Sequence, residues 1–479
     1  MTSRHRRTAA EAIALTCLAT LMVAAGFSPP ATADDPEPDN RPNIVLVLVD
    51  DMRADELARM PATNQLLVDA GTTFTNAYAT FPLCCPSRAS ILTGQYPHNT
   101  GVLGNKAPRG GFAAFDDANT VGTWLDATGY ATGYIGKYLN GYQFADPMYV
   151  PPGWDVWEAL IGGIRKPTAP QKFNVNGVEA VRTGGHQSDI LTERAAEFLR
   201  THAEQPMFVH LAYTAPHQNK TRNGWGPPIP APRHKHAFDG LTAPMGPAYN
   251  EEDVSDKPTE LQLPLLNEAR IAYTHAMAEG RAESLLAVDE GVRRLADTLQ
   301  AAGELDNTYF VFASDNGFFL GEHRRRTGKT EHYEEASGVP LVIRGPGIPA
   351  GSTNAVVGLH DLAPTFLGVT ESWEAVTDFV LDGRGLLPLA QDHTLSADRD
   401  LLIQARRPPR LNKLDYVAIR AENGWKYVRY ANGAAELYDL NTDPYELDNL
   451  AGRARFATVE QDLAQRLTQI ESCSGDGCR

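Results

Sequence analysis

Apolar stretches alternate with amphipathic ones along most of the chain. Short runs rich in β-branched and aromatic residues predict strands that are buried on both faces. These runs cover residues 44–49, 130–135, 207–213, 309–313 and 339–343. Stretches with helical periodicity lie between them at 119–128, 189–201 and 268–302, and Gly303 ends the longest one. The alternation predicts an α/β fold built on a largely parallel sheet.

From about Ala355 onward the pattern changes to short alternating runs at 416–420, 426–430 and 436–440. Asn-Gly pairs separate these runs and are a strong signal for hairpin turns. We expect a main domain over 43–354 and a C-terminal subdomain over 355–479, with a small antiparallel sheet and a helix at 458–470. The Pro-rich stretch 219–264 is unusually long for a loop, which predicts either a cleft rim or disorder.

The N-terminus has the pattern of a secretory signal peptide. Arg4, Arg6 and Arg7 precede an apolar run over 12–27, and Ala31-Thr32-Ala33 provides a small-residue cleavage site. We expect a signal over 1–33, a linker over 34–42 and a secreted or extracytoplasmic protein. The apolar run is shorter than the roughly 20 residues that span a bilayer, and no later stretch is long enough, which argues against integral membrane association.

The net charge of the chain limits the classes of molecule that it can bind. The chain has 43 basic and 59 acidic residues and a formal net charge of −16, which makes nucleic acid a poor candidate partner. A polyanionic substrate would need a local basic cluster. Two short basic runs, 233–236 and 324–326, could supply such a cluster. Each run could equally be an ordinary loop whose charged side chains face solvent.

Four cysteines follow the predicted signal. Cys473 and Cys478 enclose a four-residue loop, and in an exported protein this spacing predicts a disulfide. Cys84 and Cys85 are adjacent, which is poor geometry for a disulfide, so they are core residues, a metal pair or chemically active. Pro86 fits the first turn of a helix, and Arg88 would lie one turn after Cys84 on the same face.

Polar residues follow several predicted strands at the point where each strand ends. Because the carboxyl ends of parallel strands meet at one sheet edge, these residues should form a single site. They are Asp50, Asp51, Lys137, His217, Asp315 and Asn316. The acidic and amide members supply only oxygen ligands, which favours Ca²⁺ over Mg²⁺ and over zinc, although helix capping could also explain an Asp pair.

Eight motifs in order resemble the sulfatases of the alkaline phosphatase superfamily. They are RPNIVLVLVDD, CCPSRASILTGQYPHN, GKYLNGY, TAPH, SDNG, Lys329 before VPLVIRGPGI, HDLAPTFL and LYDLNTDPYELDNLA. Within that group, CCPSRASILTG with PHN, GKYLN and the closing CSGDGCR resemble the N-acetylglucosamine-6-sulfatase branch. The resemblance spans about 41–479 and implies an alkaline-phosphatase-like sandwich with a large mixed, mostly parallel sheet and a smaller C-terminal antiparallel sheet plus helix.

The resemblance also implies roles for individual residues. Cys84 would be oxidised to formylglycine (3-oxoalanine) by a formylglycine-generating enzyme, and its hydrate would be the nucleophile. Calcium would be held by Asp50, Asp51, Asp315, Asn316 and the modified Cys84. Arg88, Lys137 and Lys329 would position the nucleophile and the sulfate oxygens, and His217 would be the acid for the leaving group.

One position departs from the family pattern. Many arylsulfatases carry a histidine two residues after the motif lysine, whereas Tyr138, Leu139 and Asn140 follow Lys137 here. Asn140 cannot act as a base, so the residue that drives sulfate elimination stays open. We expect Asn140 to contact substrate instead.

Together these features predict a secreted sulfuric ester hydrolase that acts on a sulfated sugar, with N-acetylglucosamine 6-sulfate as one candidate. Two alternatives remain: a phosphonate or phosphodiester hydrolase that uses the same site, and a non-catalytic sulfated-glycan binder with an unmodified Cys84. The sequence leaves open the sugar, the sulfate position, endo or exo action and the oligomeric state.

Overall fold

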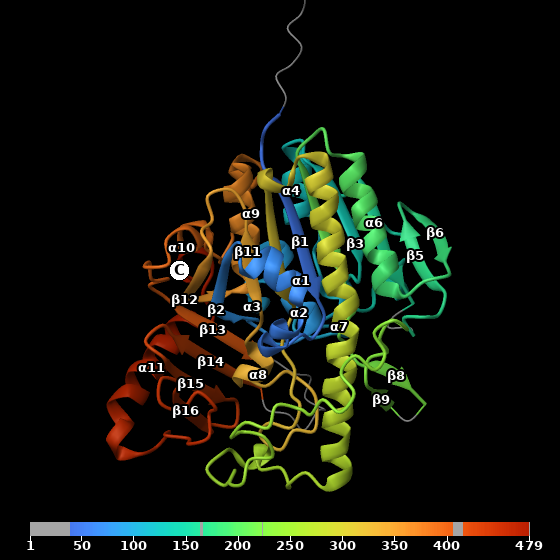
Figure 1. Cartoon of the computed structure of the whole chain (residues 1–479). Helices are drawn as coiled ribbons and strands as arrows, with labels where there is room; N and C mark the ends of the chain where they lie inside the picture. The colour runs from blue at the N-terminus through green and yellow to red at the C-terminus, as the bar shows by residue number, and fades with distance from the viewer. Residues whose placement is uncertain (1–38, 163–165, 223, 406–414, 479) are drawn as a thin grey trace, which may run out of the picture. The chain divides into compact units, whose positions relative to one another are not determined.

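A ten-stranded sheet forms the centre of the computed structural model, which describes residues 39–162, 166–222, 224–405 and 415–478 (Figure 1). The strand order is β12-β2-β11-β10-β1-β7-β3-β4-β5-β6. Their bounds are β1 (Asn43–Val49), β2 (Thr72–Tyr78), β3 (Ala131–Gly136), β4 (Val156–Ile161), β5 (Gln171–Val175), β6 (Val178–Arg182), β7 (Met207–Ala212), β10 (Thr308–Ser314), β11 (Leu341–Arg344) and β12 (Gly351–Gly358). The predicted signal peptide and most of the linker lie outside the described residues.

The centre of the sheet is parallel and its flanks are mixed. Strand β1 pairs in parallel with β10 and β7, and β3 pairs in parallel with β7 and β4. Strand β11, predicted as a strand, runs antiparallel to both β10 and β2, and β5 and β6 form an antiparallel edge. The predicted fold, a mixed and mostly parallel sheet with a second small sheet, is confirmed.

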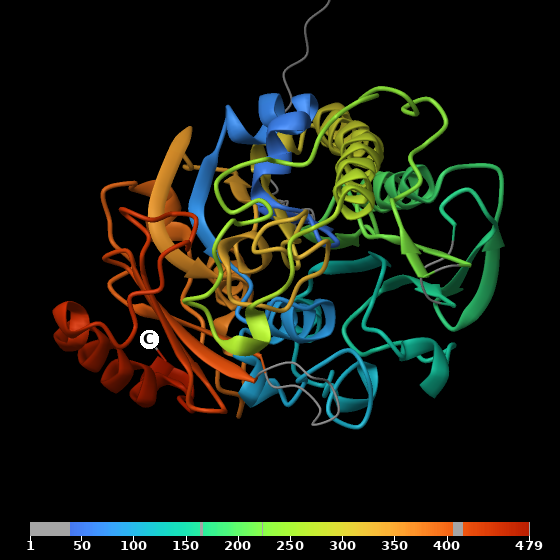
Figure 2. The same ribbon diagram turned by 90° about the horizontal axis from the view of Figure 1, so that it is seen from below.

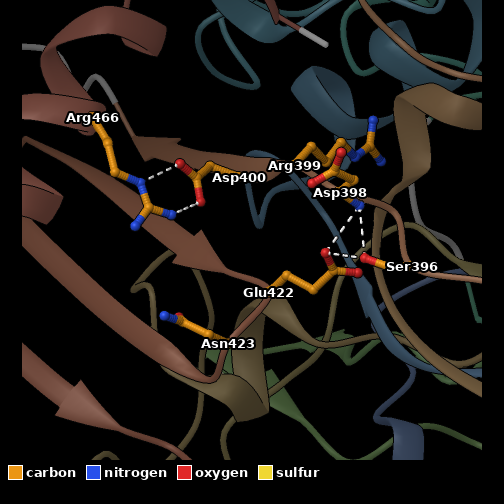
Figure 3. Close-up of a pocket in the computed structure, with 7 residues that line it drawn as sticks. All are labelled: Ser396, Asp398, Arg399, Asp400, Glu422, Asn423 and Arg466. Carbon is orange, nitrogen blue, oxygen red and sulfur yellow. Dashed lines mark hydrogen bonds and ion pairs between the residues drawn. The ribbon is translucent and has the colours of Figure 1, made fainter.

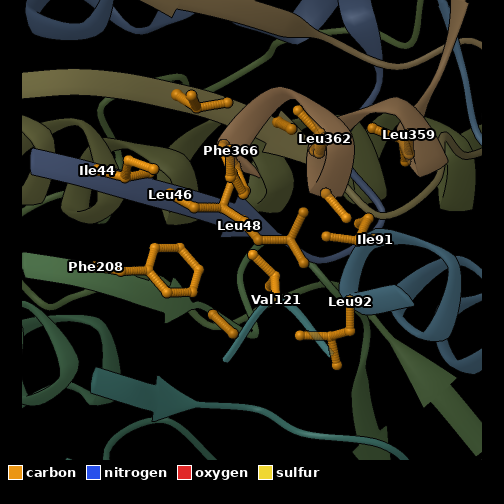
Figure 4. Packing of buried hydrophobic residues seen from close by; sticks show 14 of the residues in the cluster. Ile44, Leu46, Leu48, Ile91, Leu92, Val121, Phe208, Leu359, Leu362 and Phe366 are labelled. Atoms are coloured by element: carbon orange, nitrogen blue, oxygen red, sulfur yellow. The ribbon is translucent and has the colours of Figure 1, made fainter. Parts of the chain in front are cut away.

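Helices cover both faces of the sheet, and β1 shows how the sequence divides between them. Ile44, Leu46 and Leu48 pack with the buried side chains of α2 (Cys84–Thr93), α4 (Val121–Ala127) and α9 (Leu362–Thr370) (Figure 4). Val45, Val47 and Val49 belong to the opposite core with α6 (Gln187–Thr201) and α7 (Glu268–Ala302). Helices α6 and α7 lie beside each other and are seen end-on in Figure 2. Burial on both faces accounts for the uninterrupted apolar sequence of β1.

The second sheet is antiparallel and consists of β13 (Asp400–Ala405), β14 (Tyr416–Ala421), β15 (Trp425–Tyr430) and β16 (Ala435–Asp439). Gly424 and Gly433 have positive φ at the two predicted hairpin turns. Helix α11 (Ala457–Ile470) contacts β14 and β15, and Cys473 and Cys478 form a disulfide. Strand β12 crosses residue 355 and pairs with β2, so the start of the predicted subdomain joins the large sheet.

Short elements connect these layers. They are α1 (Pro61–Thr63), α3 (Pro97–Thr100), α5 (Tyr142–Ala145), α8 (Glu334–Ser337), α10 (Leu387–Gln391), the hairpin β8 (Asn219–Thr221) and β9 (Gly224–Gly226), the π-helical η2 (Asn64–Val68), and the 3-10 turns η1 (Ala54–Arg59), η3 (Phe112–Ala114), η4 (Thr259–Leu261), η5 (Leu305–Asn307), η6 (Leu359–Asp361), η7 (Trp373–Ala375), η8 (Ala454–Phe456) and η9 (Gly475–Cys478). None of the helices in the described part of the chain has the length and apolarity of a membrane span.

Candidate active site

The carboxyl ends of four neighbouring strands bring the predicted site residues together. Asp50 and Asp51 follow β1, Lys137 follows β3, and Asp315 follows β10. These strands are adjacent in the order β10-β1-β7-β3, and the loop after β7 carries His217. Backbone hydrogen bonds from Asp50 N to Ala215 O (3.0 Å) and from Lys137 N to Ala212 O (2.8 Å) hold the strand ends together.

Cys84 is the first residue of α2 and lies at the centre of this group. Its Sγ is 3.5 Å from Asp50 Oδ1, 3.9 Å from Asp51 Oδ1 and 2.9 Å from Lys329 Nζ. The side chain is 1% exposed, and burial raises the pKa of the thiol to about 12 although Lys137 lowers it. An unmodified Cys84 is therefore a protonated thiol at neutral pH and a poor nucleophile.

Arg88 lies one helical turn after Cys84 and is fully buried. Its Nε donates to Asp315 Oδ2 at 2.8 Å, and its Nη1 donates to the Lys137 carbonyl at 2.7 Å. Asp315 Oδ1 in turn accepts from Asp51 N at 3.0 Å. Arg88 Nη2 is buried and has no hydrogen-bond partner among the residues described, so one donor remains for a bound oxygen.

Two lysines stand among the carboxylates. Lys137 pairs with Asp50, and Lys329 pairs with Asp51 and lies 3.4 Å from Asn316 Oδ1. Burial by itself would raise the pKa of Asp50, but Lys137 and His217 hold it well below its usual value. Burial would lower the pKa of Lys329, but Asp51 raises it well above the ordinary lysine value. Asp50 is therefore negatively charged and can bind a cation, and Lys329 is positively charged and can bind an anion.

One group of these side chains could hold a metal ion. Ligand atoms of Asp50, Asp51, Cys84 and His217 all lie within 4.8 Å of one another, so this cluster could hold a metal ion. Asn316 adjoins it, because its Nδ2 donates to Asp51 Oδ1 at 2.9 Å. The cluster combines two carboxylates with a thiol and an imidazole, and Asn316 can add an amide oxygen. Each carboxylate oxygen of Asp315 accepts one hydrogen bond, Oδ2 from Arg88 Nε and Oδ1 from Asp51 N.

His217 closes one side of the site. Its Nε2 is 3.7 Å from Asp51 Oδ2, its Nδ1 is 2.8 Å from the Gln218 carbonyl, and the Trp225 ring lies edge-on at 5.4 Å. Burial lowers the pKa of His217, and Asp51 and Asp50 partly offset this effect. The side chains of His217, Lys137 and Lys329 keep 10 to 13% exposure, whereas those of Asp50 and Asp51 keep at most 2%.

Three residues that the sequence analysis did not single out support the site. Tyr134 Oη donates to the Lys137 carbonyl at 2.6 Å, and Asn105 Oδ1 accepts from Cys85 N at 2.9 Å. Arg281 Nη2 donates to the Asp51 carbonyl at 2.6 Å. Strand periodicity could have placed Tyr134 near Lys137, whereas the other two contacts join distant segments. Asn140 N donates to Cys85 Sγ at 3.0 Å, which places Asn140 beside the site.

The two basic runs are engaged elsewhere. Arg233 forms ion pairs with Asp189 and Glu290. Arg324 donates to three backbone carbonyls, and the Arg326 guanidinium lies 4.3 Å from the Tyr273 ring centre. These arginines stabilise the fold, so the cations of the site are Arg88, Lys137 and Lys329.

A separate open pocket of about 480 Å³ lies beside β13 and contains none of the predicted site residues (Figure 3). Its lining residues are Ser396, Asp398, Arg399, Asp400, Glu422, Asn423 and Arg466. The charges are already matched: Arg466 pairs with Asp400, Arg399 pairs with Asp361, and Glu422 accepts from the backbone of 397–398. The pocket therefore offers no free charge for a sulfate group.

Comparisons with known proteins agree with this geometry. Residues 42–372 match the Sulfatase family, and residues 321–473 match the family described as N-sulphoglucosamine sulphohydrolase, C-terminal. The arylsulfatase of Volvox carteri is 33% identical over 496 residues, covering 91% of this chain and 76% of the relative. The N-acetylglucosamine-6-sulfatase of Homo sapiens is 30% identical over 496 residues, covering 92% and 86%.

Solved structures give the same result. A protein in complex with its substrate D-glucosamine-2-N,6-O-disulfate has a TM-score of 0.74 and 26% identity, covering 89% of this chain and 97% of that chain. A phosphonate monoester hydrolase of Agrobacterium radiobacter has a TM-score of 0.68 at 22% identity, covering 89% and 95%, a likeness of fold alone. The Sulfatase match spans more than half of the chain, which confirms the resemblance of the motifs: the chain belongs to the sulfatase family of sulfuric ester hydrolases.

Proposed function

We propose that this sulfatase removes sulfate from a sulfated amino sugar, with N-acetylglucosamine 6-sulfate as the first candidate, and that it uses a formylglycine formed from Cys84. The observation that carries the proposal is the position of Cys84 Sγ, 2.9 Å from Lys329 Nζ and 3.5 Å from Asp50 Oδ1. The 30% identical N-acetylglucosamine-6-sulfatases and the neighbour that binds glucosamine-2-N,6-O-disulfate support the substrate class.

Cys84 supplies the nucleophile in this proposal. A hydrated aldehyde at this position offers one hydroxyl group whose oxygen attacks sulfur. The second hydroxyl can then lose its proton and become the carbonyl oxygen, while the bond between carbon and the sulfated oxygen breaks and sulfate is released. The position at the start of α2 favours negative charge, because the first N–H groups of a helix are free and carry partial positive charge. A formylglycine-generating enzyme is the maturation partner that this chemistry requires.

A calcium ion would be held by Asp50, Asp51, Asp315, Asn316 and the modified Cys84, with Mg²⁺ a poorer fit. When bound, the cation supplies positive charge beside the sulfate group. His217 lies within the same cluster and is kept for proton transfer in this proposal. Its second nitrogen faces the Gln218 carbonyl, which fixes the orientation of the ring.

The remaining cations hold the sulfate oxygens. Lys137 and Lys329 lie at the exposed face of the site, and Arg88 has a buried donor to spare. Such fixed charges stabilise the negative charge that develops during sulfate transfer. An anionic substrate beside His217 raises the pKa of the ring, so that Nε2 can carry the proton that the departing sugar hydroxyl needs. Asn140 contacts the sugar in this arrangement.

The remaining parts of the chain have proposed roles in export and organisation. Residues 1–33 serve as a secretory signal and 34–42 as a linker, which makes the mature enzyme secreted or extracytoplasmic. Residues 43–354 form the catalytic domain, and 355–479 form a subdomain with the small sheet. Partners are the sulfated carbohydrate and the maturation enzyme, without nucleic acid and without integral membrane association.

Mass spectrometry of the tryptic peptide 60–88, from protein made in its own host, tests the proposal. We expect an aldehyde at Cys84, together with release of sulfate from N-acetylglucosamine 6-sulfate. Cys84→Ala should abolish this release, whereas the neighbouring control Cys85→Ala should keep the aldehyde. An intact thiol at Cys84 would overturn the mechanism and favour a non-catalytic glycan binder.

Paired aryl esters separate sulfatase activity from the phosphonate or phosphodiester alternative. We expect a higher kcat/KM for the aryl sulfate than for the aryl phosphonate or phosphodiester with the same leaving group. A reversed preference would assign the site to phosphorus chemistry, because a site discriminates through contacts that strengthen in the transition state.

A further inference from the structure

A second group of acidic side chains lies where the segment after β9 crosses α7. Asp239 belongs to this segment, and Glu279 and Glu283 are one helical turn apart on α7. Ligand oxygens of the three residues all lie within 4.8 Å of one another. The cluster shares no residue with the candidate active site. Figure 1 shows the segment running beside the half of α7 that holds the helix N-terminus.

Glu283 is the member that the fold alone does not explain. Its side chain is 5% exposed, and its Oε1 is buried without a hydrogen-bond partner in the described structure. Asp289, on the same helix and equally buried, accepts from Ala62 N, Thr63 N and Thr63 Oγ1 at 2.7 to 2.9 Å. An unpaired buried carboxylate costs several kcal/mol, so Glu283 needs a positive partner.

The neighbours of the cluster do not neutralise it. Glu279 Oε2 accepts from Gly240 N at 3.0 Å, and Asp239 Oδ1 is 2.8 Å from His236 Nδ1. Within the described ranges, no lysine or arginine forms an ion pair with any of the three carboxylates. Two glutamates at positions i and i+4 of a helix repel each other, and a third carboxylate adds to that repulsion.

We propose that Asp239, Glu279 and Glu283 bind a divalent cation, Ca²⁺ in preference to Mg²⁺. The ligands are carboxylate oxygens from a loop and a helix, and Ca²⁺ accepts such irregular oxygen sets whereas Mg²⁺ demands near-ideal octahedral geometry. The bound ion fixes the segment after β9 to α7. This site is structural and independent of the proposed chemistry at Cys84.

The site connects to the rim of the active site. Trp225 lies in β9, directly before this segment; its ring contacts His217, and its carbonyl accepts from Tyr273 Oη on α7 at 2.6 Å. Tyr249, further along, bonds to Thr274 Oγ1 at 2.8 Å. Asp239 lies between Trp225 and Tyr249 in sequence. A cation bound there would add a third contact between this part of the chain and α7.

Calcium content of the full-length enzyme tests the proposal. After equilibration with micromolar Ca²⁺ and removal of free ion, elemental analysis should give one fewer Ca²⁺ per chain in Glu283→Gln than in the wild type. Asp297→Asn is the matched control, because Asp297 is exposed on the same helix and lies outside the cluster. Asp50→Asn tests the candidate active site, so that Ca²⁺ lost from that site and Ca²⁺ lost from the Glu283 cluster are measured in separate variants.

Limited proteolysis supplies the second readout. Ca²⁺ should slow cleavage within 219–264 in the wild type and in Asp297→Asn, and this protection should be lost in Glu283→Gln and in Asp239→Asn. The latter variant changes an exposed side chain, so it remains informative if Glu283→Gln fails to fold. Equal calcium content and equal protection in wild type, Glu283→Gln and Asp239→Asn would overturn the proposal.

Discussion

Arg88 shows what one side chain contributes when both of its partners are buried. Its guanidinium joins α2 to the end of β10 through Asp315 and to the end of β3 through the Lys137 carbonyl. Desolvation opposes this arrangement, and two well-directed hydrogen bonds compensate for it. Removing Arg88 would leave the Asp315 charge buried and unpaired.

We therefore expect Arg88→Met to lower the free energy of unfolding by about 3–5 kcal/mol, the range for breaking a buried pair. Arg233→Met is the control, because Arg233 pairs with two carboxylates but is 43% exposed, and its loss should cost about 0–1 kcal/mol. Urea unfolding in excess Ca²⁺ measures both values. Equal losses would mean that burial does not decide the strength of the Arg88 contacts.

His217 allows a prediction about the leaving group. If its Nε2 protonates the departing oxygen, His217→Gln should lower kcat for a sugar sulfate by about 10²–10⁴-fold. The loss should be much smaller for nitrophenyl sulfate, because a phenolate of low pKa leaves without a proton. His202→Gln, at the end of α6, is the control and should leave both kcat values unchanged. An equal loss for both substrates would assign His217 a positioning role.

At the scale of elements, Gly136 determines how β3 delivers Lys137. Its φ is +115°, and a Cβ at this position would lie 2.0 Å from the Ala212 carbonyl oxygen on β7. Only glycine tolerates both the backbone conformation and the close approach of the next strand. The sheet therefore requires glycine at position 136, and the site uses the lysine that follows it.

Gly136→Ala should therefore lower the free energy of unfolding by about 2 kcal/mol or more beyond the effect of Gly129→Ala. Gly129 also has a positive φ (+83°), but the nearest atom to its Cβ would be 3.8 Å away. Both variants carry the left-handed penalty of about 1–2 kcal/mol, and only Gly136→Ala adds the collision. Urea unfolding of the two proteins compares them, and equal losses would contradict the steric argument.

The elements also show which parts of the fold the sequence could predict. Helix α7 has the predicted bounds, because Asn267 caps its start through Arg270 N and Gly303 ends it. Strands β2 and β12 were not predicted, since TTFTNAY and GSTNAVVG mix polar and apolar positions at one edge of the sheet. The antiparallel direction of β11 depends on a chain reversal that leaves no local pattern.

The same distinction holds for the candidate site. Asp50, Lys137 and Asp315 could be predicted because each follows a buried strand. Lys329 lies in a loop without periodicity, and only the family resemblance pointed to it, yet its Nζ lies 2.9 Å from Cys84 Sγ. The second acidic cluster joins 239 to α7 across about 40 residues of chain, a contact that no motif describes.

At the scale of the whole molecule, His323 ties together segments that are distant in sequence. Its Nδ1 is 2.8 Å from Glu251, its Nε2 is 3.6 Å from Glu335 on α8, and its ring stacks on Tyr333. Lys257 is 3.0 Å from Glu251 and shares that carboxylate. Burial by itself would lower the pKa of His323, but Glu251 and Glu335 raise it to about 9.

This raised pKa predicts a loss of stability toward alkaline pH. The charged ring contributes fully below the unfolded value near 6.5, and its contribution disappears as pH rises through about 9. The wild type should lose about 3 kcal/mol of unfolding free energy relative to His323→Gln between pH 6 and pH 9.5. Urea unfolding of both proteins across this range tests the difference, and a difference that does not change with pH would contradict it.

Every residue of α2, including Cys84, is buried in the folded protein. A modifying enzyme must reach the Cys84 side chain, and a fully buried helix cannot expose it without unfolding. If Cys84 is oxidised to formylglycine as proposed, this oxidation must therefore precede folding. Incubation of the folded thiol form with a formylglycine-generating enzyme should leave Cys84 unchanged, whereas the isolated peptide 60–88 should be converted.

Under the proposed mechanism, the fraction of active molecules is decided during synthesis, by whether the nascent chain is oxidised before the core closes around α2. Molecules that fold first would then stay inactive, however stable they are, because the packing around α2 would shield the Cys84 thiol from the modifying enzyme. Slower folding at low temperature, with more of the maturation enzyme present, should increase the yield of active enzyme without changing the amount of folded protein.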